Sequence, residues 1–444
     1  MSRIAQLAVT IGALLIAAPL ARAAEESDCH VGAYRLTDGA VIDVSPSEPG
    51  TLRWRNFDGL TGALTKAADG SWTSTYGWTG RADGKTLRFS ECPAGRIDFN
   101  GVEGRRIAFD VTDTTFVSHG VTLAGRLVLP KGTEVAPIVV LVHGAEHDSA
   151  LTFYALQRLL PAEGVGAFVY DKRGTGASGG SYSQDFSLLA DDAAAAMREA
   201  RRLAGPRAGR VGYQAGSQGG WVAPIAANRA HVDFVIVCFG LAVTVIQEDQ
   251  EEVALEMREE GHSPAEIADA LKVARAAEQV IASGFARGFG ELDAERAKYR
   301  AASWYKDLHG NFTYMLLPYD EAHLRELGSQ FRWGTPFHYE PMPTLAADTT
   351  PQLWILGTED YEAPSAETSR RIGSLIAKRL PFTLAVYPGA EHGMTLFEKG
   401  AGGERLSTRY APGYFSMIRD FALSGRLSGA YGDARLTRPR QPSR

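Results

Sequence analysis

The sequence predicts an α/β protein: a mostly parallel sheet flanked by helices, with an inserted helical cap and an N-terminal β-rich domain. In residues 106–240 and 346–424, buried-strand patterns alternate with helical patterns. Residues 241–345 break this alternation with a charged stretch of helical spacing. Residues 24–105 hold short alternating runs between Asp-Gly turns, which is typical of small β domains. A chain of 444 residues is long enough for this division.

Residues 1–23 have the pattern of a signal peptide. Arg3 precedes an uncharged apolar run over 4–18, and Ala21-Arg22-Ala23 is a small-x-small cleavage site. A membrane anchor is the alternative, but the run is short for a span and Glu25-Glu26 follow it at once. We therefore expect cleavage at this site, a periplasmic or secreted mature protein, and no membrane span after cleavage.

The three cysteines fall into two groups. Cys29 and Cys92 lie in the β-rich domain, whereas Cys238 lies in an apolar run far along the chain. An oxidising compartment favours pairing, so we predict a disulfide between Cys29 and Cys92. In the chain-entropy model a loop of this length adds about 4 kcal/mol of stability. Cys238 is expected to be a buried free thiol.

The β-rich domain also contains Trp54, Trp72 and Trp78. Aromatic residues of this kind can line a ligand or glycan site. In a small sheet they are more often part of the core. We therefore expect these three side chains to be core residues.

The α/β part can be divided into elements from its apolar runs. The predicted strands are 137–142, 165–170, 211–214, 234–239, 352–356 and 383–387. A hairpin around Ser118-His119-Gly120 is expected ahead of them, and helices are expected over 188–203 and 414–423. The remaining tail, 425–444, is rich in Arg, Pro, Gly and Ser and is expected to be flexible.

The cap has one clear helix start. Ser263-Pro264-Ala265-Glu266 combines an N-cap residue, a first-position proline and a capping-box glutamate. Apolar residues follow at helical spacing as far as Ile281. This helix is expected to end near Ser283-Gly284.

Ser217 is the predicted nucleophile. It lies in Ala215-Gly216-Ser217-Gln218-Gly219-Gly220, between a predicted strand and a predicted helix. This context is typical of a nucleophile elbow, in which tight packing requires small residues beside the serine. Ala215 replaces the first glycine of the usual G-x-S-x-G pattern, a small-for-small difference. A chance serine in a Gly-rich turn is the alternative.

A serine hydroxyl needs a base, and His392 is the best placed histidine. It follows the strand 383–387, at the sheet edge where α/β proteins place their sites. The base needs a carboxylate to hold its tautomer, and Asp360 follows the strand 352–356. Glu359 and Glu362 are rivals for this role. The order Ser217, Asp360, His392 is the one that α/β-hydrolases use.

An oxyanion hole is the fourth expected component. One donor should be the backbone N–H of Gln218, directly after the nucleophile. The second should come from the loop after Val142-His143-Gly144, where Ala145 is the natural candidate. The Gly-rich loop 171–179 lacks phosphate-binding spacing, and no metal-ligand motif occurs, so we expect neither a cofactor nor a metal.

Together these motifs resemble the α/β-hydrolase superfamily, over roughly residues 106–424. They are His143-Gly144, the loop from Asp171 to Ser178, Gly216 to Gly220, Gly357 to Asp360, and Glu391-His392-Gly393. The closest likeness is to exported bacterial esterase-like or serine-peptidase-like hydrolases with a cap and an N-terminal β domain. The resemblance implies an eight-stranded, mostly parallel sheet and an acyl-enzyme mechanism.

The expected function is a serine hydrolase that cleaves an ester-type bond in a small-molecule ester or acyl substrate. A peptidase, a thioesterase or an acyltransferase with the same triad is the first alternative, because specificity depends on the cap and pocket. A non-catalytic exported protein that binds cell-wall or glycan material through the β domain is the second. The net charge of −6 argues against nucleic acid as a partner. The oligomeric state stays open.

Overall fold

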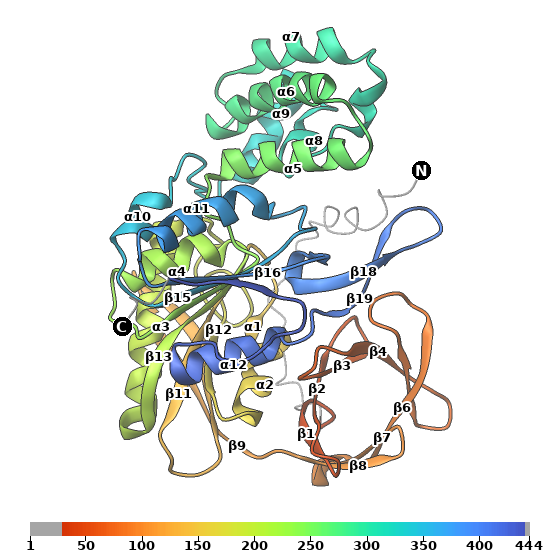
Figure 1. The fold of residues 1–444 in the computed structure, drawn as a ribbon, viewed down its shortest axis with the longest axis vertical. Coiled ribbons are helices and arrows are strands. Elements are labelled where there is room, and N and C mark those ends of the chain that lie inside the picture. The colour runs from red at the N-terminus through yellow and green to blue at the C-terminus, as the bar shows by residue number, and fades with distance from the viewer. Residues whose placement is uncertain (1–28, 440–444) are drawn as a thin grey trace. The chain divides into compact units, whose positions relative to one another are not determined.

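The computed structural model describes residues 29–439 (Figure 1). The predicted signal peptide, residues 1–23, lies outside them. The chain divides into two compact units. The first comprises the residues up to Ala108 together with Thr395–Phe415, and the second comprises Phe109–Met394 together with the residues from Ser416 onward. From the sequence we expected 395–415 in the α/β core, but this segment belongs to the first unit.

The first unit is a closed barrel of eight antiparallel strands. The strands are β1 (Gly32–Leu36), β2 (Val41–Pro46), β3 (Leu52–Asn56), β4 (Thr61–Lys66), β5 (Trp72–Thr75), β6 (Ala82–Glu91), β7 (Arg96–Phe99) and β8 (Val102–Arg106). Each strand pairs with its neighbour in sequence, and β1 pairs with β8 to close the barrel. Closure leaves no free edge on which another strand could add. The β-rich domain predicted from the Asp-Gly turns is therefore a barrel.

The tryptophans of the barrel differ in burial. Trp54 and Trp72 are buried in its core, as expected. Trp78 is 37% exposed, so the prediction that all three are core residues is wrong for this one. Its ring lies 5.5 Å from the ring of Tyr410, and the Arg53 guanidinium lies 4.2 Å from its centroid. Trp78 is outside the core because it packs on the hairpin of β18 (Thr395–Lys399) and β19 (Arg405–Tyr410).

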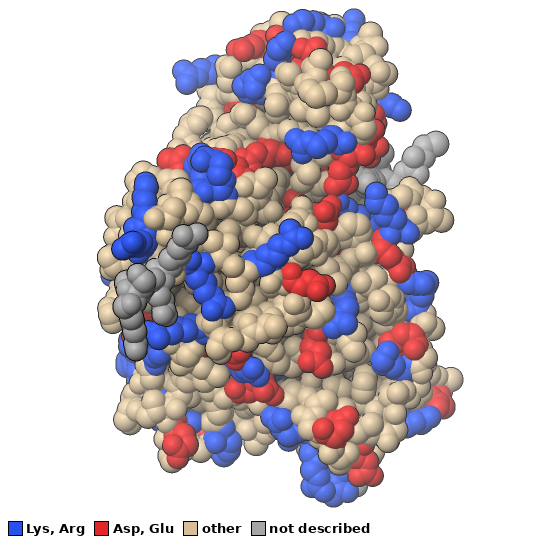
Figure 2. All heavy atoms as spheres, viewed as in Figure 1, with Lys and Arg blue, Asp and Glu red and all other residues tan. Residues whose placement is uncertain are grey.

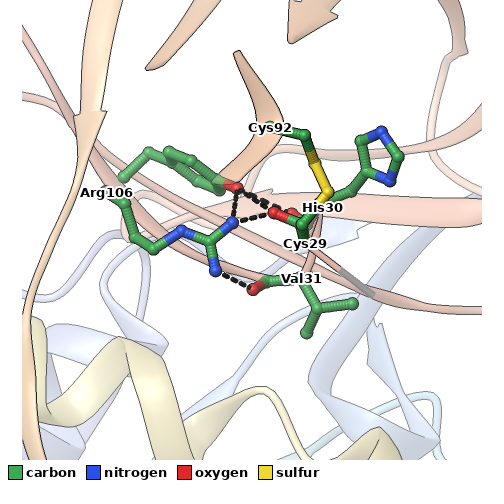
Figure 3. The surroundings of a disulfide bond; sticks show 6 residues. Cys29, His30, Val31, Cys92 and Arg106 are labelled. Atoms are coloured by element: carbon green, nitrogen blue, oxygen red, sulfur yellow. Dashed lines mark hydrogen bonds between the residues drawn. A yellow bond between two sulfur atoms is a disulfide. The ribbon is translucent and has the colours of Figure 1, made fainter. Parts of the chain in front are cut away.

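The predicted disulfide between Cys29 and Cys92 is confirmed, with the two Cα atoms 5.4 Å apart (Figure 3). The bond links Cys29, in the segment before β1, to Cys92, the residue that follows β6. Arg106 supports the same region, because its guanidinium donates to the carbonyls of Val31 (2.8 Å) and Cys29. Cys238 is a buried free thiol, as expected.

The second unit is built on a nine-stranded sheet in the order β20-β16-β15-β14-β13-β11-β12-β10-β9. Its strands are β9 (Phe109–Ser118), β10 (Val121–Pro130), β11 (Ala136–Val142), β12 (Gly166–Tyr170), β13 (Ala208–Gly216), β14 (Val235–Cys238), β15 (Gln352–Gly357), β16 (Phe382–Tyr387) and β20 (Arg435–Thr437). The strands from β12 to β16 are parallel, and the edges β9, β10 and β20 are antiparallel.

The ninth strand corrects the expectation for the C-terminal tail. We expected 425–444 to be flexible and the sheet to have eight strands. Instead β20 pairs with β16, and Leu436 lies opposite Ala385. The strand Arg435–Thr437 could not be predicted from the sequence, because three residues are too few to show an alternation of apolar and polar side chains.

Helices cover the sheet. They are α1 (Ala150–Phe153), α2 (Leu156–Ala162), α3 (Phe186–Ala204), α4 (Gly219–Ala227), α11 (Ser365–Ala377) and α12 (Tyr414–Ser424). The apolar strands and the inward faces of α3, α4 and α11 share one buried cluster. Helix α4 packs on β13 and β14, which places its first residue at the carboxyl ends of these strands.

The cap is helical, as the sequence predicts. It contains α5 (Val245–Glu259), α6 (Pro264–Ala282), α7 (Phe289–Tyr299), α8 (Thr313–Leu316) and α9 (Glu321–Leu327) (Figure 1). Helix α10 (Met342–Ala347) instead packs on α4, and its Leu345 belongs to the buried cluster of the sheet. The capping box is confirmed: Ser263 accepts from the backbone N–H of Glu266, whose carboxylate accepts from that of Ser263. None of the described helices is long and apolar enough to cross a membrane.

Candidate active site

Ser217 lies on a sharp turn between β13 and α4. Its φ of 51° is in the left-handed region, which a residue with a side chain occupies at a cost in energy. The turn is held on both sides: the Ser217 N–H donates to the Cys238 carbonyl (3.1 Å), and the Gly220 N–H donates to the Ser217 carbonyl (2.7 Å). A strained serine between a strand and a helix is the geometry of a nucleophile elbow.

The glycines beside Ser217 are required by close packing. A Cβ on Gly216 would lie 2.8 Å from the Phe239 ring, and one on Gly219 would lie 2.9 Å from the His143 carbonyl oxygen. Real Cβ atoms do not approach other atoms this closely. Close packing therefore explains why the residues beside Ser217 are small.

Asp360 and His392 are brought together, as predicted. Nδ1 of His392 lies 3.0 Å from Oδ1 and 3.1 Å from Oδ2 of Asp360. Asp360 is 1% exposed, and its Oδ1 also accepts from the Ala363 N–H at 2.8 Å. Of the two rival carboxylates, Glu362 instead approaches the other ring nitrogen, Nε2, at 3.6 Å. The geometry thus favours Asp360 as the residue that orients the imidazole.

Neighbouring strands set the positions of these residues. Ser217 follows β13 and Asp360 follows β15, with β14 between the two strands. His392 follows β17 (Ala390–Glu391), after β16. The Glu359 N–H donates to the Ala390 carbonyl at 2.9 Å, which joins the acid turn to the histidine loop. All three residues therefore extend from the carboxyl ends of one parallel set of strands.

Phe239, at the end of β14, lies between the nucleophile and the histidine. Its ring centroid is 4.9 Å from that of His392 in an edge-on arrangement, and its ring borders Gly216. In the described part of the chain, Ser217 Oγ makes no hydrogen bond with His392. Contacts of this kind are often long without substrate and tighten in the complex. The pairing of Ser217 with His392 therefore stays a prediction.

The loop after β11 lies against the nucleophile. A Cβ on Gly144 would lie 3.3 Å from Ser217 Cβ. The Lys172 ammonium donates to the Gly144 carbonyl at 2.7 Å. The C=O and N–H of a peptide point in opposite directions, so this bond turns the Ala145 N–H away from Lys172. Among the described residues, neither the Ala145 nor the Gln218 backbone N–H has a hydrogen-bond acceptor, as an oxyanion hole requires.

The model of the family described as serine aminopeptidase, S33, matches residues 133–275. The match spans the loop of Ala145, the turn of Ser217 and the first cap helices. The chain has the α/β-hydrolase fold. Asp360, His392 and the barrel lie outside the match. No curated protein gives a significant sequence match to this chain.

Solved structures similar to this chain include esterases and a peptidase. An esterase of Pyrococcus furiosus has 15% identity and a TM-score of 0.40, covering 64% of this chain and 84% of its own. An acylaminoacyl peptidase of Pyrococcus horikoshii has 15% identity and a TM-score of 0.42, covering 87% and 57%. A thermophilic esterase of Thermogutta terrifontis has 20% identity and a TM-score of 0.36, covering 63% and 91%.

The charge of His392 is set by opposing effects. Burial lowers the pKa of the imidazole, but the carboxylates of Asp360 and Glu362, with a contribution from Glu248, outweigh burial and raise that pKa to about 9. The imidazole is therefore mostly protonated at neutral pH. An imidazole can accept a proton only in its neutral form, which becomes more populated as the pH rises.

Lys172 is the site residue that sequence reasoning missed. It is buried, and burial lowers the pKa of its ammonium to about 8. Its Nζ lies 4.6 Å from the ring centroid of Tyr182, whose hydroxyl donates to the Ala145 carbonyl at 2.5 Å. The flanking residues anchor the loop: Arg173 pairs with Asp192 at 2.6 Å, and Asp171 accepts from the Ala177 N–H at 2.8 Å. The sequence feature that could have pointed to Lys172 is its position between Asp171 and Arg173.

Proposed function

We propose that this protein is a serine hydrolase that cleaves an ester-type bond through an acyl-enzyme intermediate. Ser217 is the nucleophile, His392 the general base and Asp360 the residue that orients the base. The backbone N–H groups of Ala145 and Gln218 form the oxyanion hole. The observation that carries the proposal is the hydrogen bond between Asp360 and His392 Nδ1, at the sheet edge that holds the strained Ser217. No cofactor enters the reaction.

In the first half-reaction Ser217 Oγ attacks the carbonyl carbon while His392 Nε2 takes the hydroxyl proton. The π electrons move to the carbonyl oxygen, which Ala145 and Gln218 stabilise as an oxyanion. When the carbonyl reforms, the bond to the leaving alcohol breaks. His392 then gives its proton to the alcohol oxygen, and the acyl group stays on Ser217.

In the second half-reaction water replaces the alcohol. His392 takes a proton from the water as its oxygen attacks the acyl carbon, and the same two N–H groups hold the second oxyanion. The ester bond to Ser217 breaks, the acid leaves, and the serine oxygen recovers its proton from His392. One water is consumed for each ester, and Asp360 keeps Nδ1 protonated throughout.

The same triad would also serve a peptidase, a thioesterase or an acyltransferase. The description of the matching family as serine aminopeptidase supports the peptidase alternative. Specificity follows from the groups around the acyl and leaving groups, which the fold does not determine. Hydrolysis rates for p-nitrophenyl esters of several chain lengths, compared with those for aminoacyl-nitroanilides, decide between an esterase and a peptidase.

A fluorophosphonate probe tests the nucleophile. We expect the wild-type protein to be labelled at Ser217 and the Ser217→Ala variant to remain unlabelled. The same substitution should lower turnover by about a million-fold, because the triad acts as a unit. Unchanged circular dichroism and melting temperature would show that the variant is folded. If the wild type takes no label and hydrolyses no ester, the proposal is wrong and a binding role through the barrel gains support.

A further inference from the structure

Two side chains hold the peptides on either side of Ala145, the expected second donor of the oxyanion hole. The Lys172 ammonium donates to the Gly144 carbonyl at 2.7 Å, and the Tyr182 hydroxyl donates to the Ala145 carbonyl at 2.5 Å. A peptide is planar, so a bond to its carbonyl also sets the direction of its N–H. Together the two bonds fix both peptide planes that meet at the Cα atom of Ala145.

Ala145 depends on these bonds because it is an exposed loop residue, which the packing of its own side chain does little to hold. Lys172, in contrast, is only 2% exposed, whereas the Lys and Arg side chains seen on the face drawn in Figure 2 lie at the surface. A donor of an oxyanion hole stabilises charge only if it is in place before the reaction starts. Fixed partners such as Lys172 supply that order to the exposed loop.

The ring of Tyr182 is packed against three neighbours. The His147 ring is stacked on it, with 3.6 Å between the centroids and 16° between the planes. The Lys172 ammonium lies 4.6 Å from its centroid, and the Trp333 ring meets it edge-on at 5.8 Å. His147 belongs to the same loop as Ala145, so the ring and the hydroxyl of Tyr182 both contact that loop.

The Tyr182 hydroxyl is also an acceptor, which directs its own proton toward Ala145. Gln184 Nε2 donates to the Tyr182 hydroxyl at 3.0 Å, and the Thr335 hydroxyl donates to Gln184 Oε1 at 2.6 Å. The hydrogen bonds therefore run in one direction, from Thr335 through Gln184 and Tyr182 to the Ala145 carbonyl. In such a chain each bond polarises the next and strengthens it.

The chain of hydrogen bonds begins in the segment 332–341, which joins the cap to helix α10. The backbone of this segment holds the Tyr182 region as well, because the Trp333 carbonyl accepts from the Gln184 N–H at 2.7 Å and from the Ser183 hydroxyl at 3.2 Å. The Trp333 ring lies 5.0 Å from the ring of Phe331, which packs on the buried cluster of the cap. The residues that hold Ala145 are therefore themselves held by the end of the cap.

We propose that Tyr182 is a positioning residue for the oxyanion hole, and that the segment 332–341 sets its position through Thr335 and Gln184. The inference rests on the proposed function, because this oxyanion hole serves Ser217. Tyr182 acts through Ala145 and not on the reacting atoms. Without its hydroxyl, the loop is held on one side of Ala145 only, so the N–H is correctly placed for less of the time. Stabilisation of the oxyanion then falls, while binding of the uncharged substrate does not.

A pair of ketone inhibitors separates stabilisation of the oxyanion from binding. Ser217 Oγ forms a bond to the carbonyl carbon of hexyl trifluoromethyl ketone, its proton passes to His392, and the ketone oxygen becomes an oxyanion. Hexyl methyl ketone has nearly the same shape but lacks the electron-withdrawing fluorines, so it stays a non-covalent ligand. Inhibition of the hydrolysis of p-nitrophenyl hexanoate gives a Ki for each ketone.

Tyr182→Phe removes only the hydroxyl. We expect kcat/KM to fall about tenfold, which is less than the roughly 100- to 1000-fold cost of deleting a whole oxyanion donor. The Ki of the trifluoromethyl ketone should rise by the same factor, and that of the methyl ketone should not change. Thr335→Val, which removes the first donor of the chain, should act in the same direction with a smaller effect. Thr335→Ser restores the hydroxyl and should recover the wild-type values.

Tyr339→Phe is the matched control. Tyr339 lies in the same segment, 332–341, but its hydroxyl is hydrogen-bonded to the Thr344 hydroxyl at 2.8 Å and takes no part in the chain to Ala145. We expect this variant to keep the wild-type kcat/KM and both Ki values. Circular dichroism and the melting temperature show whether each variant is folded, and Thr335→Val decides the question if Tyr182→Phe is not.

The possible outcomes separate this inference from the function on which it rests. If the wild type hydrolyses no ester and the fluorophosphonate probe does not react, the hydrolase assignment itself fails. If the wild type is active and folded Tyr182→Phe keeps its Ki for the trifluoromethyl ketone, the enzyme stands and the positioning role is wrong. An equal rise in both Ki values, or the same effect in Tyr339→Phe, would also overturn it, since Tyr182 would then only support the general structure. Wild-type values for Thr335→Val would overturn the link to the segment 332–341.

Discussion

His392 lies between two carboxylates that differ in exposure. Asp360 is buried and fixed by the Ala363 N–H, which holds its carboxylate beside Nδ1. The side chain of Glu362 is 70% exposed and lies 3.6 Å from Nε2, the nitrogen that must accept the serine proton. Asp360 favours the tautomer with the proton on Nδ1, which leaves Nε2 able to accept a proton. Glu362 instead stabilises the protonated imidazole, which cannot act as a base.

Removal of the Glu362 charge should therefore shift the pH profile. Glu362→Gln is expected to lower the pKa of His392 and to move the acidic limb of kcat/KM from near pH 9 to lower pH. The shift should be about one pH unit or less, because charges about 4 Å apart in water interact by ~1 kcal/mol. Initial rates from pH 6 to 10 measure it. Glu359→Gln is the control, and a shift of equal size there would contradict the assignment.

Single residues could be predicted from the sequence where a motif constrains them. Ser217 has a spacing of small residues around it, and Asp360 and His392 each follow a strand. Glu252 and Lys172 lie in no such pattern. They are buried in the folded protein, and the sequence does not show this burial. An acidic residue on a helix is normally exposed, so the sequence favours a solvated face for Glu252.

At the scale of elements, long periodic segments were predicted well and short ones were not. The buried strands β11 to β16 are continuous apolar runs, and their order follows from parallel α/β packing. The strand β20 was missed because it has three residues and gains its stability from pairing with β16. The helix α6 was recognised from its N-terminal capping sequence and from the apolar residues that follow at helical spacing.

The start of α6 gives a prediction for the cap. Ser263→Ala removes the acceptor for the Glu266 N–H and one half of the capping box. We expect a loss of about 1 kcal/mol in the stability of the cap, since N-cap substitutions typically cost this much. Urea unfolding followed by circular dichroism measures the change. Ser263→Asp, which restores an acceptor, should recover most of it; failure to do so would mean that the cap does not depend on this bond.

At the scale of the whole molecule, two separate segments of the chain form the first unit: the residues up to Ala108 and the segment Thr395–Phe415. The hairpin of β18 and β19 leaves the α/β unit after the histidine loop and packs on the barrel, where Tyr410 contacts Trp78 and Arg55. Tyr410 comes more than 300 residues after these partners, and no local pattern reveals so distant a contact. For this reason the sequence placed 395–415 in the α/β core.

The disulfide connects the stability of the barrel with the compartment of the protein. Cys29 and Cys92 are 63 positions apart in the sequence, and closure of a loop of this length is worth about 4 kcal/mol in the chain-entropy model. Produced with its leader, the chain should reach the periplasm or the medium shortened by residues 1–23 and oxidised at both cysteines. Produced in a reducing cytosol without the leader, it should keep free thiols and have a less stable barrel.

Mass spectrometry of alkylated samples and thermal melting compare the two preparations. Cys29→Ser in the exported protein should reproduce the lower stability of the cytosolic form, because either change opens the same loop. Cys238→Ala serves as the control for thiol loss, since this residue is buried in the other unit and has no disulfide. Equal melting temperatures for the oxidised and reduced barrels would show that the core of the barrel alone is sufficient. In that case the disulfide would no longer argue for export.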